Sequence, residues 1–460
     1  MRPIVQPIFF LAWSVIALAS IAQAADEAPK PKPNIVCILA DDMGYADAGF
    51  NGGKKIQTPH LDRLAKAGTI LRSFYVQPVC SPTRSSLMTG RYVTHTGVYS
   101  VVKPTTPWGL PLAERTLAQA LREAGYETAI SGKWHLGEFQ PAYLPTKRGF
   151  DHQYGLWFGA IDYYTHKRES ILDWHRNDEP CEDEGYSTHL IAKEASRLIR
   201  ERDTSKPLFL YLPFNAVHGP LQVPESYLAP YGTLTGKRKT YAGMLAAMDE
   251  AIGQVVAALE EKKMLGHTLI IFSSDNGGPS PGTVTDNGSL REGKGTIYEG
   301  GVRVCAFASW PGHIPAGKIV DEPIHIIDWY PTLVTLAGGS LQQPLPLDGK
   351  DLWPVLTQGA KSPHEALLLH STSFGKAAVR VGDWKLHQGQ EGGKGVKKKA
   401  AGKSNNEYQL YNLANDIGET KNLATSNPEK LAEMKDVLKR LLKDAVPSGE
   451  KGQPGSGKEE

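Results

Sequence analysis

The alternation of apolar segments with helical segments constrains the fold of this chain more than any other feature of its sequence. Strand-like apolar runs open the segments NIVCILADD (34–42), ETAISGKWH (127–135), LFLYLPFNAVH (208–218) and TLIIFSSDNGG (268–278). Amphipathic helical patterns occupy TPHLDRLAKAGT (58–69), RTLAQALREAGY (115–126) and YAGMLAAMDEAIGQVVAALEEKK (241–263). Repeated strand, helix, strand units predict an α/β fold, in which helices cover both faces of a mostly parallel sheet.

The pattern changes after about residue 362, where short strand-like runs replace the long ones. These runs are KAAVRVGDWKLH (376–387) and EYQLYNL (407–413), and a helical pattern, NPEKLAEMKDVLKRLLKDA (427–445), follows them. We therefore expect a large domain at 25–362 and a smaller antiparallel sheet with a helix at 363–446. The polar tail at 447–460 is expected to be disordered.

The N-terminus has the form of an export signal. Arg2 precedes a mostly apolar run from Ile8 to Ile21, and Ala22-Gln23-Ala24 matches a signal-peptidase site. We predict that residues 1–24 are a signal peptide, that the protein is exported to the periplasm or secreted, and that the mature chain has no membrane span. The formal net charge of +2 gives no field that would indicate a nucleic-acid partner.

The cysteines do not form a disulfide framework. Only Cys37, Cys80, Cys181 and Cys305 occur, and a chain of 460 residues can be stabilised by its core. Cys37 and Cys305 lie in apolar runs, where a buried thiol is expected. Cys80 differs, because it lies in the polar, hydroxyl-rich segment QPVCSPTRSSLMTGRY.

Polar side chains follow each predicted strand of the sheet. They are Asp41 and Asp42, Lys133 and His135, His218, and Asp275 and Asn276. In an open parallel sheet, ligands bind beyond the carboxyl ends of the strands. One acidic pair could belong to a solvated turn, but two sets of carboxylate and amide oxygens favour a site for Ca²⁺ or Mg²⁺.

The segment CSPTRSSLMTGR resembles the signature of the sulfatase family, in which a Cys-x-Pro-x-Arg core directs conversion of the cysteine to formylglycine. The segments ILADDMGYAD, GKWHLG, NAVHGPLQVP, SSDNGG and REGKGTIYEGGVR stand in the order found in sulfatases. Within the family, IDYYTHKRE and KPLFLYLPFNAVHGPLQVPESYLAPY are similar to the arylsulfatase B type. The resemblance implies an alkaline-phosphatase-like α/β fold and hydrolysis of sulfate esters.

The resemblance also implies a modified residue and a metal. Cys80 would be converted to formylglycine by a formylglycine-generating enzyme, and its hydrate would supply one hydroxyl to attack sulfur and another to expel sulfate. The cation would be Ca²⁺, with Mg²⁺ as the alternative. Its ligands would be Asp41, Asp42, residue 80, Asp275 and Asn276.

The same resemblance assigns roles to basic residues. Arg84 would orient the hydroxyls of residue 80, while Lys133 and Lys294 would bind sulfate oxygens. His135 would be the base that drives collapse of the sulfated intermediate, and His218 the acid that protonates the leaving alcohol. Glu299 and Arg303 are expected to shape the loop that carries Lys294 rather than to act on substrate.

Several functional alternatives remain open at this stage. A cysteine-dependent phosphatase is disfavoured, because it needs five residues between its cysteine and arginine, whereas three separate Cys80 from Arg84. A formylglycine-dependent phosphonate or phosphate monoesterase, or an inactive protein that binds sulfated polysaccharide, would share these motifs. The expected substrate is a saccharide carrying N-acetylgalactosamine 4-sulfate, of chondroitin or dermatan type. The lysine-rich stretch 391–403 is read as a solvated loop, or alternatively as a guide for a polyanion.

Overall fold

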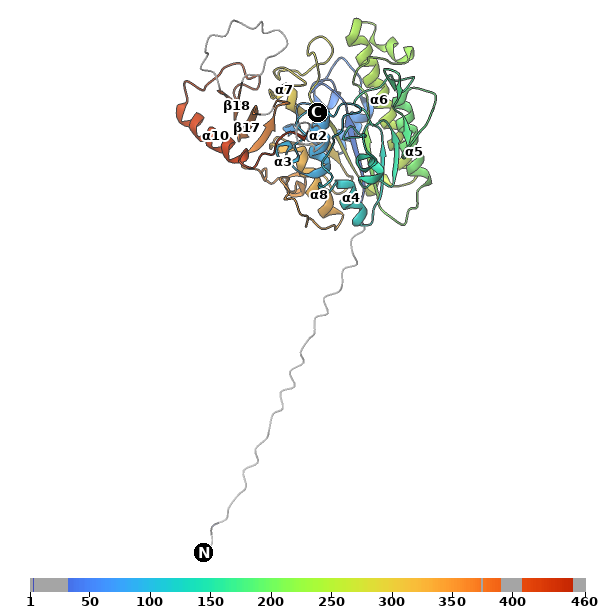
Figure 1. Cartoon of the computed structure of the whole chain (residues 1–460), viewed down its shortest axis with the longest axis horizontal. Coiled ribbons are helices and arrows are strands. Elements are labelled where there is room, and N and C mark those ends of the chain that lie inside the picture. The colour runs from blue at the N-terminus through green and yellow to red at the C-terminus, as the bar shows by residue number, and fades with distance from the viewer. Residues whose placement is uncertain (1–2, 4–31, 374, 390–407, 450–460) are drawn as a thin grey trace, which may run out of the picture. The chain divides into compact units, whose positions relative to one another are not determined.

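The computed structural model describes residue 3 and residues 32–373, 375–389 and 408–449 (Figure 1). The chain divides into two units, 1–31 and 32–460, and every described helix and strand belongs to the second. The predicted signal peptide, the lysine-rich stretch 391–403 and most of the predicted disordered tail lie outside the described residues. Those predictions therefore stay predictions.

A ten-stranded mixed sheet forms the centre of the second unit. Its strands, in spatial order, are β14 (Lys318–Val320), β2 (Thr69–Leu71), β13 (Ala306–Ser309), β11 (Thr268–Ser274), β1 (Asn34–Ala40), β10 (Leu208–Pro213), β4 (Glu127–Ser131), β5 (His152–Gly155), β8 (His175–Arg176) and β9 (Glu179–Pro180). The five strands from β11 to β5 are all parallel, whereas β13, β8 and β9 pair antiparallel with their neighbours. The predicted α/β class is confirmed.

Helices cover both faces of this sheet because side chains alternate along each strand. On β1, Val36 and Ile38 pack into one apolar cluster, and Ile35 and Leu39 pack into the other. The first cluster is completed by helices α1 (Pro59–Lys66), α5 (Ser187–Glu201) and α6 (Gly236–Glu261). The second is completed by α2 (Cys80–Thr89), α4 (Leu117–Glu123) and α8 (Trp329–Leu336) (Figure 1).

Helix α6 is apolar enough to raise the question of a membrane span. Among the described residues it alone has the length and composition to cross a membrane, with a mean hydropathy of 1.3 in its most apolar window. However, 78% of that window is buried inside the protein. Met244 and Met248 are fully buried in the core.

A second, antiparallel sheet follows in the C-terminal part of the chain. Its strands pair in the order β16 (Leu367–His370), β17 (Ala377–Val381), β18 (Trp384–Gln388) and β19 (Tyr408–Asn412). Helix α10 (Pro428–Leu441) buries Met434 and Leu438 against one face of this sheet. The predicted small sheet with a closing helix is confirmed, whereas the predicted domain limits at 362 and 446 stay predictions.

Several short elements lie outside these two sheets. A three-stranded sheet pairs β12 (Arg303–Val304) with β3 (Phe74–Tyr75), and β3 with β15 (Ile324–His325). The others are the hairpin β6 (Lys167–Arg168) and β7 (Ile171–Leu172), and the helices α3 (Val93–Thr96), α7 (Glu299–Val302) and α9 (Trp353–Gln358). All four cysteines are free thiols, and Cys37 and Cys305 are buried as predicted.

Candidate active site

The carboxyl ends of β1 and β11 deliver the acidic residues to one place. The two strands are parallel and in register, with Ala40 opposite Ser274. Asp41 and Asp275, the next residues on each strand, therefore emerge side by side, and the Asp275 amide donates to the carbonyl of Ala40 at 2.9 Å. Both carboxylates are fully buried.

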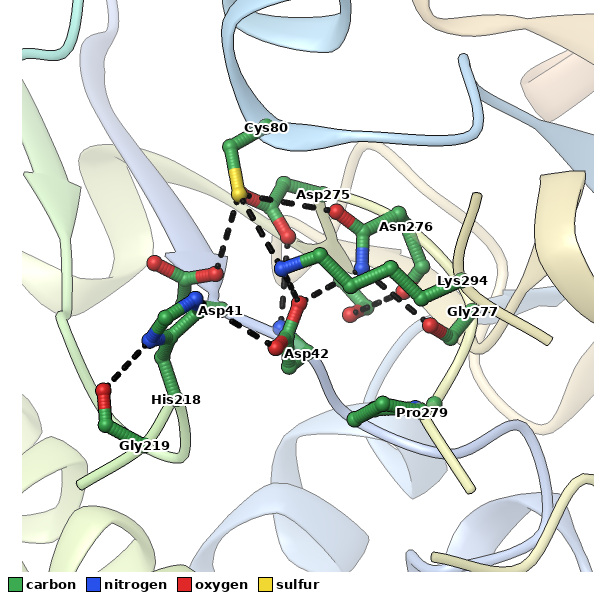
Figure 2. A network of polar contacts seen from close by, with 12 residues as sticks. Asp41, Asp42, Cys80, His218, Gly219, Asp275, Asn276, Gly277, Pro279 and Lys294 are labelled. Atoms are coloured by element: carbon green, nitrogen blue, oxygen red, sulfur yellow. Dashed lines mark hydrogen bonds and ion pairs between the residues drawn. The ribbon is translucent and has the colours of Figure 1, made fainter. Parts of the chain in front are cut away.

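Asp42 and Asn276 extend this group of oxygens (Figure 2). The Asn276 side-chain amide donates to Asp42 Oδ1 at 2.7 Å and to the Gly277 carbonyl at 3.1 Å. Its oxygen consequently points the other way and lies 3.7 Å from Cys80 Sγ. The Asp42 amide donates to Asp275 Oδ1 at 3.3 Å, so the acidic residues hold one another in place.

Cys80 is the first residue of α2, and its Sγ lies over these oxygens. Asp41 Oδ1 is 3.4 Å from the sulfur, and Lys294 Nζ is 3.5 Å from it on the other side (Figure 2). Burial, together with the charges of Asp275 and Asp41, raises the pKa of the Cys80 thiol. The unmodified cysteine is therefore protonated and a poor nucleophile in this setting.

Hydroxyl groups fix the polar segment that carries Cys80. Thr83 Oγ1 accepts from the Gln77 amide and donates to the Gln77 carbonyl, both at 3.0 Å. Ser81 Oγ accepts from the Val102 amide at 3.0 Å, and Ser85 bonds to Thr96 at 3.1 Å. These bonds allow all ten residues of α2 to be buried although most are polar.

Arg84 and Lys133 neutralise the buried carboxylates. Arg84 donates to Asp275 Oδ2 through Nη2 at 2.9 Å and Nε at 3.3 Å, and its Nη1 donates to the Lys133 carbonyl at 2.7 Å. Lys133 Nζ donates to Asp41 Oδ2, and both side chains are fully buried. The guanidinium thus holds the Asp275 carboxylate and the Lys133 backbone, and its expected contact with the hydroxyls of residue 80 stays a prediction.

Lys294 plays the same electrostatic part beside Asp42. Its Nζ donates to Asp42 Oδ1. Burial raises the pKa of the Asp41 and Asp42 carboxyls, but Lys133 beside Asp41 and Lys294 beside Asp42, together with His218, hold both pKa values below the ordinary value. Both acids are therefore ionised and available as ligands.

The two histidines differ in environment. His218 lies 3.6 Å, through Nε2, from Asp42 Oδ2, and its Nδ1 lies 2.6 Å from the Gly219 carbonyl (Figure 2). His135 Nε2 donates to the Val102 carbonyl at 2.9 Å, while its buried Nδ1 has no partner. Burial and the charges of Lys133 and Arg84 hold the pKa of His135 well below its ordinary value. His135 is therefore a neutral imidazole with a free basic nitrogen.

The residues of the site differ in their exposure to solvent. The side chains of His218 and Lys294 are 26% and 19% exposed, whereas those of Arg84, Lys133 and Asp41 are fully buried. A cavity of about 650 Å³ begins at Lys294 and is lined further by Pro279, Thr283 and Glu292. His218 and Lys294 are thus the site residues that reach solvent-accessible space.

The donor set fits a hard divalent cation. Ligating atoms of Asp41, Asp42, Cys80 and His218 lie within 4.8 Å of one another, and Asn276 turns its amide oxygen toward the same space. Carboxylate and amide oxygens are the donors that Ca²⁺ and Mg²⁺ prefer. His218 was predicted only as an acid, and its place among the ligating atoms had no signal in the sequence.

All the predicted site residues except His135 are joined by direct contacts around Cys80. His135 makes no such contact, but it lies close enough to Lys133, Arg84 and His218 for these residues to lower its pKa. One supporting residue was missed: Ser274 Oγ accepts from the Met43 amide at 2.9 Å and donates to the Asn276 carbonyl at 2.8 Å. Its only signal was its place at the end of β11.

Comparison with known proteins agrees with this geometry. The Sulfatase family model matches residues 33–340. The chain is 40% identical to arylsulfatase J of Mus musculus, over 81% of this chain and 68% of the relative. It is 34% identical to N-acetylgalactosamine-6-sulfatase of Sus scrofa, over 82% of this chain and 75% of that protein.

Among solved structures, Ps i-CgsB in complex with k-i-k-neocarrahexaose superposes with a TM-score of 0.82 at 34% identity. The match covers 91% of this chain and 94% of that one. The chain belongs to the sulfatase family and is a sulfuric ester hydrolase.

Proposed function

We propose that this protein hydrolyses sulfate monoesters on a saccharide that contains N-acetylgalactosamine, using a formylglycine made from Cys80 and a bound divalent cation. One observation supports the proposal most strongly. Cys80 Sγ lies within 3.4 to 3.7 Å of Asp41, Lys294 and Asn276, at the start of a helix that opens with Cys-Ser-Pro-Thr-Arg. Residue 80 therefore contacts two of the proposed metal ligands, Asp41 and Asn276, and also the Lys294 ammonium group, which can bind a sulfate oxygen.

The formylglycine would be made before the fold closes. The Cys80 side chain is 2% exposed, so a modifying enzyme could not reach it in the folded protein. We infer that the formylglycine-generating enzyme acts on the unfolded chain, and that the predicted signal peptide exports the protein to the periplasm or the medium. The hydrate of the aldehyde supplies one hydroxyl for attack on sulfur and a second for expulsion of sulfate.

Asp41, Asp42, Asp275 and Asn276 would hold the cation, which we propose to be Ca²⁺, with Mg²⁺ as the alternative. When bound, it stabilises negative charge on residue 80 and on the transferring group. The protein keeps its ligands ionised by placing Lys133 and Lys294 against Asp41 and Asp42. Arg84 keeps Asp275 in position by donating a hydrogen bond to its carboxylate.

Lys133 and Lys294 also provide charge for the sulfate group. Lys294 is the better placed of the two, because its Nζ is 3.5 Å from Cys80 Sγ and its side chain is partly exposed to solvent. We therefore assign Lys294 to binding a sulfate oxygen as the ester enters. Lys133 is fully buried against Asp41, and we assign it a supporting role in binding the sulfate group.

The histidines would move protons on opposite sides of the reaction. His218 is partly exposed, and its Nδ1 donates to the Gly219 carbonyl, so its Nε2 can carry a proton to the leaving alcohol. From the motif resemblance we propose that His135 takes a proton from the second hydroxyl of residue 80, and its buried Nδ1 has no hydrogen-bond partner among the described residues. These roles match those that the sequence motifs imply.

The position of the sulfate on the sugar is open to a direct test. Motif resemblance favours the 4-sulfate of N-acetylgalactosamine, which we retain as the proposal. A relative named N-acetylgalactosamine-6-sulfatase, at 34% identity, makes the 6-sulfate the competing position. Purified protein should be assayed on chondroitin disaccharides that differ only in 4- or 6-sulfation. A higher kcat/KM for the 6-sulfate would overturn the proposed position but leave the sulfatase chemistry intact.

A phosphate or phosphonate monoesterase is the second candidate, because the cations at the site could bind either anion. Binding more tightly to a doubly charged phosphate ester does not by itself raise the rate. We therefore expect phosphate esters to act as inhibitors or slow substrates. Sulfate and phosphate esters of one leaving group should be compared, and a tenfold preference for phosphate, about 1.4 kcal/mol, would favour the second candidate. An unmodified Cys80 with no turnover on either ester would indicate an inactive binding protein.

A further inference from the structure

Two C-terminal sequence motifs, VRVGDWKLH and YQLYNLANDIGETKNL, have no part in the chemistry described so far. Together with α7 and β3 they form a buried cluster of ionisable side chains, here called the carboxylate cluster. Its members are Tyr75, Glu299, Arg380, Lys385, His387 and Glu419. None of them is more than 7% exposed. Figure 1 shows α7 beside β17 and β18, so the cluster joins the C-terminal sheet to the catalytic part of the protein.

Glu419 makes the connecting contacts in this cluster. Its Oε1 accepts from Lys385 Nζ at 3.1 Å and lies 2.8 Å from His387 Nε2. Its Oε2 accepts from the backbone amide of Glu299 at 2.7 Å. The Glu299 side chain in turn bonds to Lys385 Nζ at 2.8 Å and to the Tyr75 hydroxyl at 2.7 Å. The Glu419 side chain therefore holds the backbone of Glu299, the first residue of α7.

The same glutamate also holds the other end of the loop that carries Lys294. Arg291 Nη1 donates to the backbone carbonyl of Glu419 at 2.6 Å. Between these two anchors, the Gly295 amide donates to the Pro78 carbonyl at 2.8 Å, two residues before Cys80. The loop 291–299 is thus fastened at both ends to Glu419 and in the middle to the segment that leads to Cys80.

Glu299 keeps its charge although it is buried in this cluster. Burial raises the pKa of Glu299, but Lys385, Arg303 and Arg380 outweigh burial and lower it to about 2. Buried carboxylates with several hydrogen-bond donors are rigid, because each lost partner leaves a desolvated charge. A loop tied to such a group is held more firmly than one tied by solvent-exposed bonds.

We propose that Glu419 is a positioning residue for sulfate ester hydrolysis: by closing the loop 291–299, it sets the place of Lys294 Nζ over residue 80. Lysine has a flexible side chain, so the direction of its ammonium group depends on how firmly its backbone is held. The inference rests on the proposed function of Lys294. It gives the C-terminal sheet a part in catalysis, although no residue of that sheet is among the contacts of Cys80.

A double-mutant cycle tests the proposal. Glu419→Gln should lower kcat/KM for a sulfate ester by roughly tenfold to a hundredfold, the loss expected from a small misplacement of a catalytic group. In a Lys294→Ala background, the same substitution should lower kcat/KM by no more than about twofold, because the group that Glu419 positions is already missing. A twofold difference is about the scatter within which the effects of independent substitutions add. Equal losses in the two backgrounds would overturn the proposal, because Glu419 would then act independently of Lys294.

A matched control separates positioning from general stability. Glu114 is 3% exposed and pairs with Arg91 at 3.2 Å, away from the loop. Glu114→Gln should lower stability but should cost the same factor with or without Lys294. If Glu419→Gln does not fold, Arg291→Gln, a change at a partly exposed residue of the same loop, takes its place in the cycle.

Hydrogen exchange gives a second readout that needs no activity. In Glu419→Gln, the amides of Gly295, Glu299 and Gly300 should exchange faster than in Glu114→Gln. Unchanged exchange within 291–302 would overturn the claim that Glu419 holds this loop. A wild-type protein without sulfatase activity would defeat the proposed function instead, and the exchange result would still decide the structural claim.

Discussion

Replacing Lys385 by methionine should destabilise the protein severely. Lys385 is fully buried, and its Nζ lies 2.8 Å from Glu299 and 3.1 Å from Glu419. Methionine keeps most of the length of the side chain but removes the charge, so two buried carboxylates lose their shared partner. Breaking a buried ion pair from one side costs about 3–5 kcal/mol. Because domains are stable by only about 5–15 kcal/mol, this loss is a large fraction of the total.

The chain offers a matched control for this substitution. Lys361 pairs with Glu322 at 2.9 Å, nearly the same distance, but its side chain is 91% exposed. Solvent screens such a pair, and both partners are hydrated when it is broken. Lys361→Met should therefore unfold at the same midpoint as the wild type.

Urea unfolding followed by tryptophan fluorescence and circular dichroism measures both variants. Lys385→Met should show a lower midpoint with an unchanged slope, which indicates lost stability rather than a changed unfolded state. Adding Glu419→Gln to Lys385→Met should recover part of the loss, because it removes one of the unpaired charges. Equal midpoints for Lys385→Met and Lys361→Met would refute the argument from burial.

Three further outcomes are expected. Cys80→Ser should fold normally but release no free sulfate and at most one alcohol per molecule, since serine keeps the transferred sulfate as an ester and lacks the second hydroxyl that expels it; sustained turnover on an aryl sulfate would contradict the formylglycine mechanism. Asp275→Ala should weaken cation binding measured by calorimetry and lower activity steeply, with recovery at best in excess metal; full activity after verified metal removal would contradict a metal-dependent site. The pKa of Glu299 is lowered to about 2, so the contribution of Glu299 to stability is complete above about pH 4.5 and is lost as the pH falls toward 2. In Glu299→Gln, the free energy of unfolding should therefore depend less steeply on pH between about pH 4.5 and 2. An unchanged pH dependence would show that Glu299 does not titrate as described.

The central strands could be predicted because they are buried on both faces. β1, β10 and β11 are buried along their whole length, and β1 and β11 are each followed directly by an aspartate. The convergence of Asp41 and Asp275 followed from the parallel order of these strands. Fold class and most of the site were thus within reach of local patterns and family motifs.

Elements whose form depends on tertiary contacts were not predicted. The residues of α2 show little apolar periodicity. The helix can be buried because Ser81, Thr83 and Ser85 form hydrogen bonds with residues outside the helix. The short strands β2 and β13 pair across more than 200 residues of sequence, with Ile70 opposite Phe307. Such pairing has no local signal.

The details of the site also depended on three-dimensional contacts. Sequence motifs gave no sign that Arg84 donates to Asp275 and to the Lys133 carbonyl, while its expected role toward the hydroxyls of residue 80 stays a prediction. The link from Glu419 to the Lys294 loop joins residues that are more than 100 positions apart in the sequence. No spacing rule connects them, because the contact exists only when the C-terminal sheet packs against α7.

The most direct test of the account is the chemical state of residue 80 in active protein. Mass spectrometry of the tryptic peptide Ser73–Arg84 should show a mass about 18 Da lower than that of the unmodified cysteine peptide, as formylglycine requires. Across preparations that differ in the extent of conversion, sulfate release per molecule should rise in proportion to the formylglycine fraction. Undiminished turnover by protein in which residue 80 is entirely cysteine would contradict the central claim.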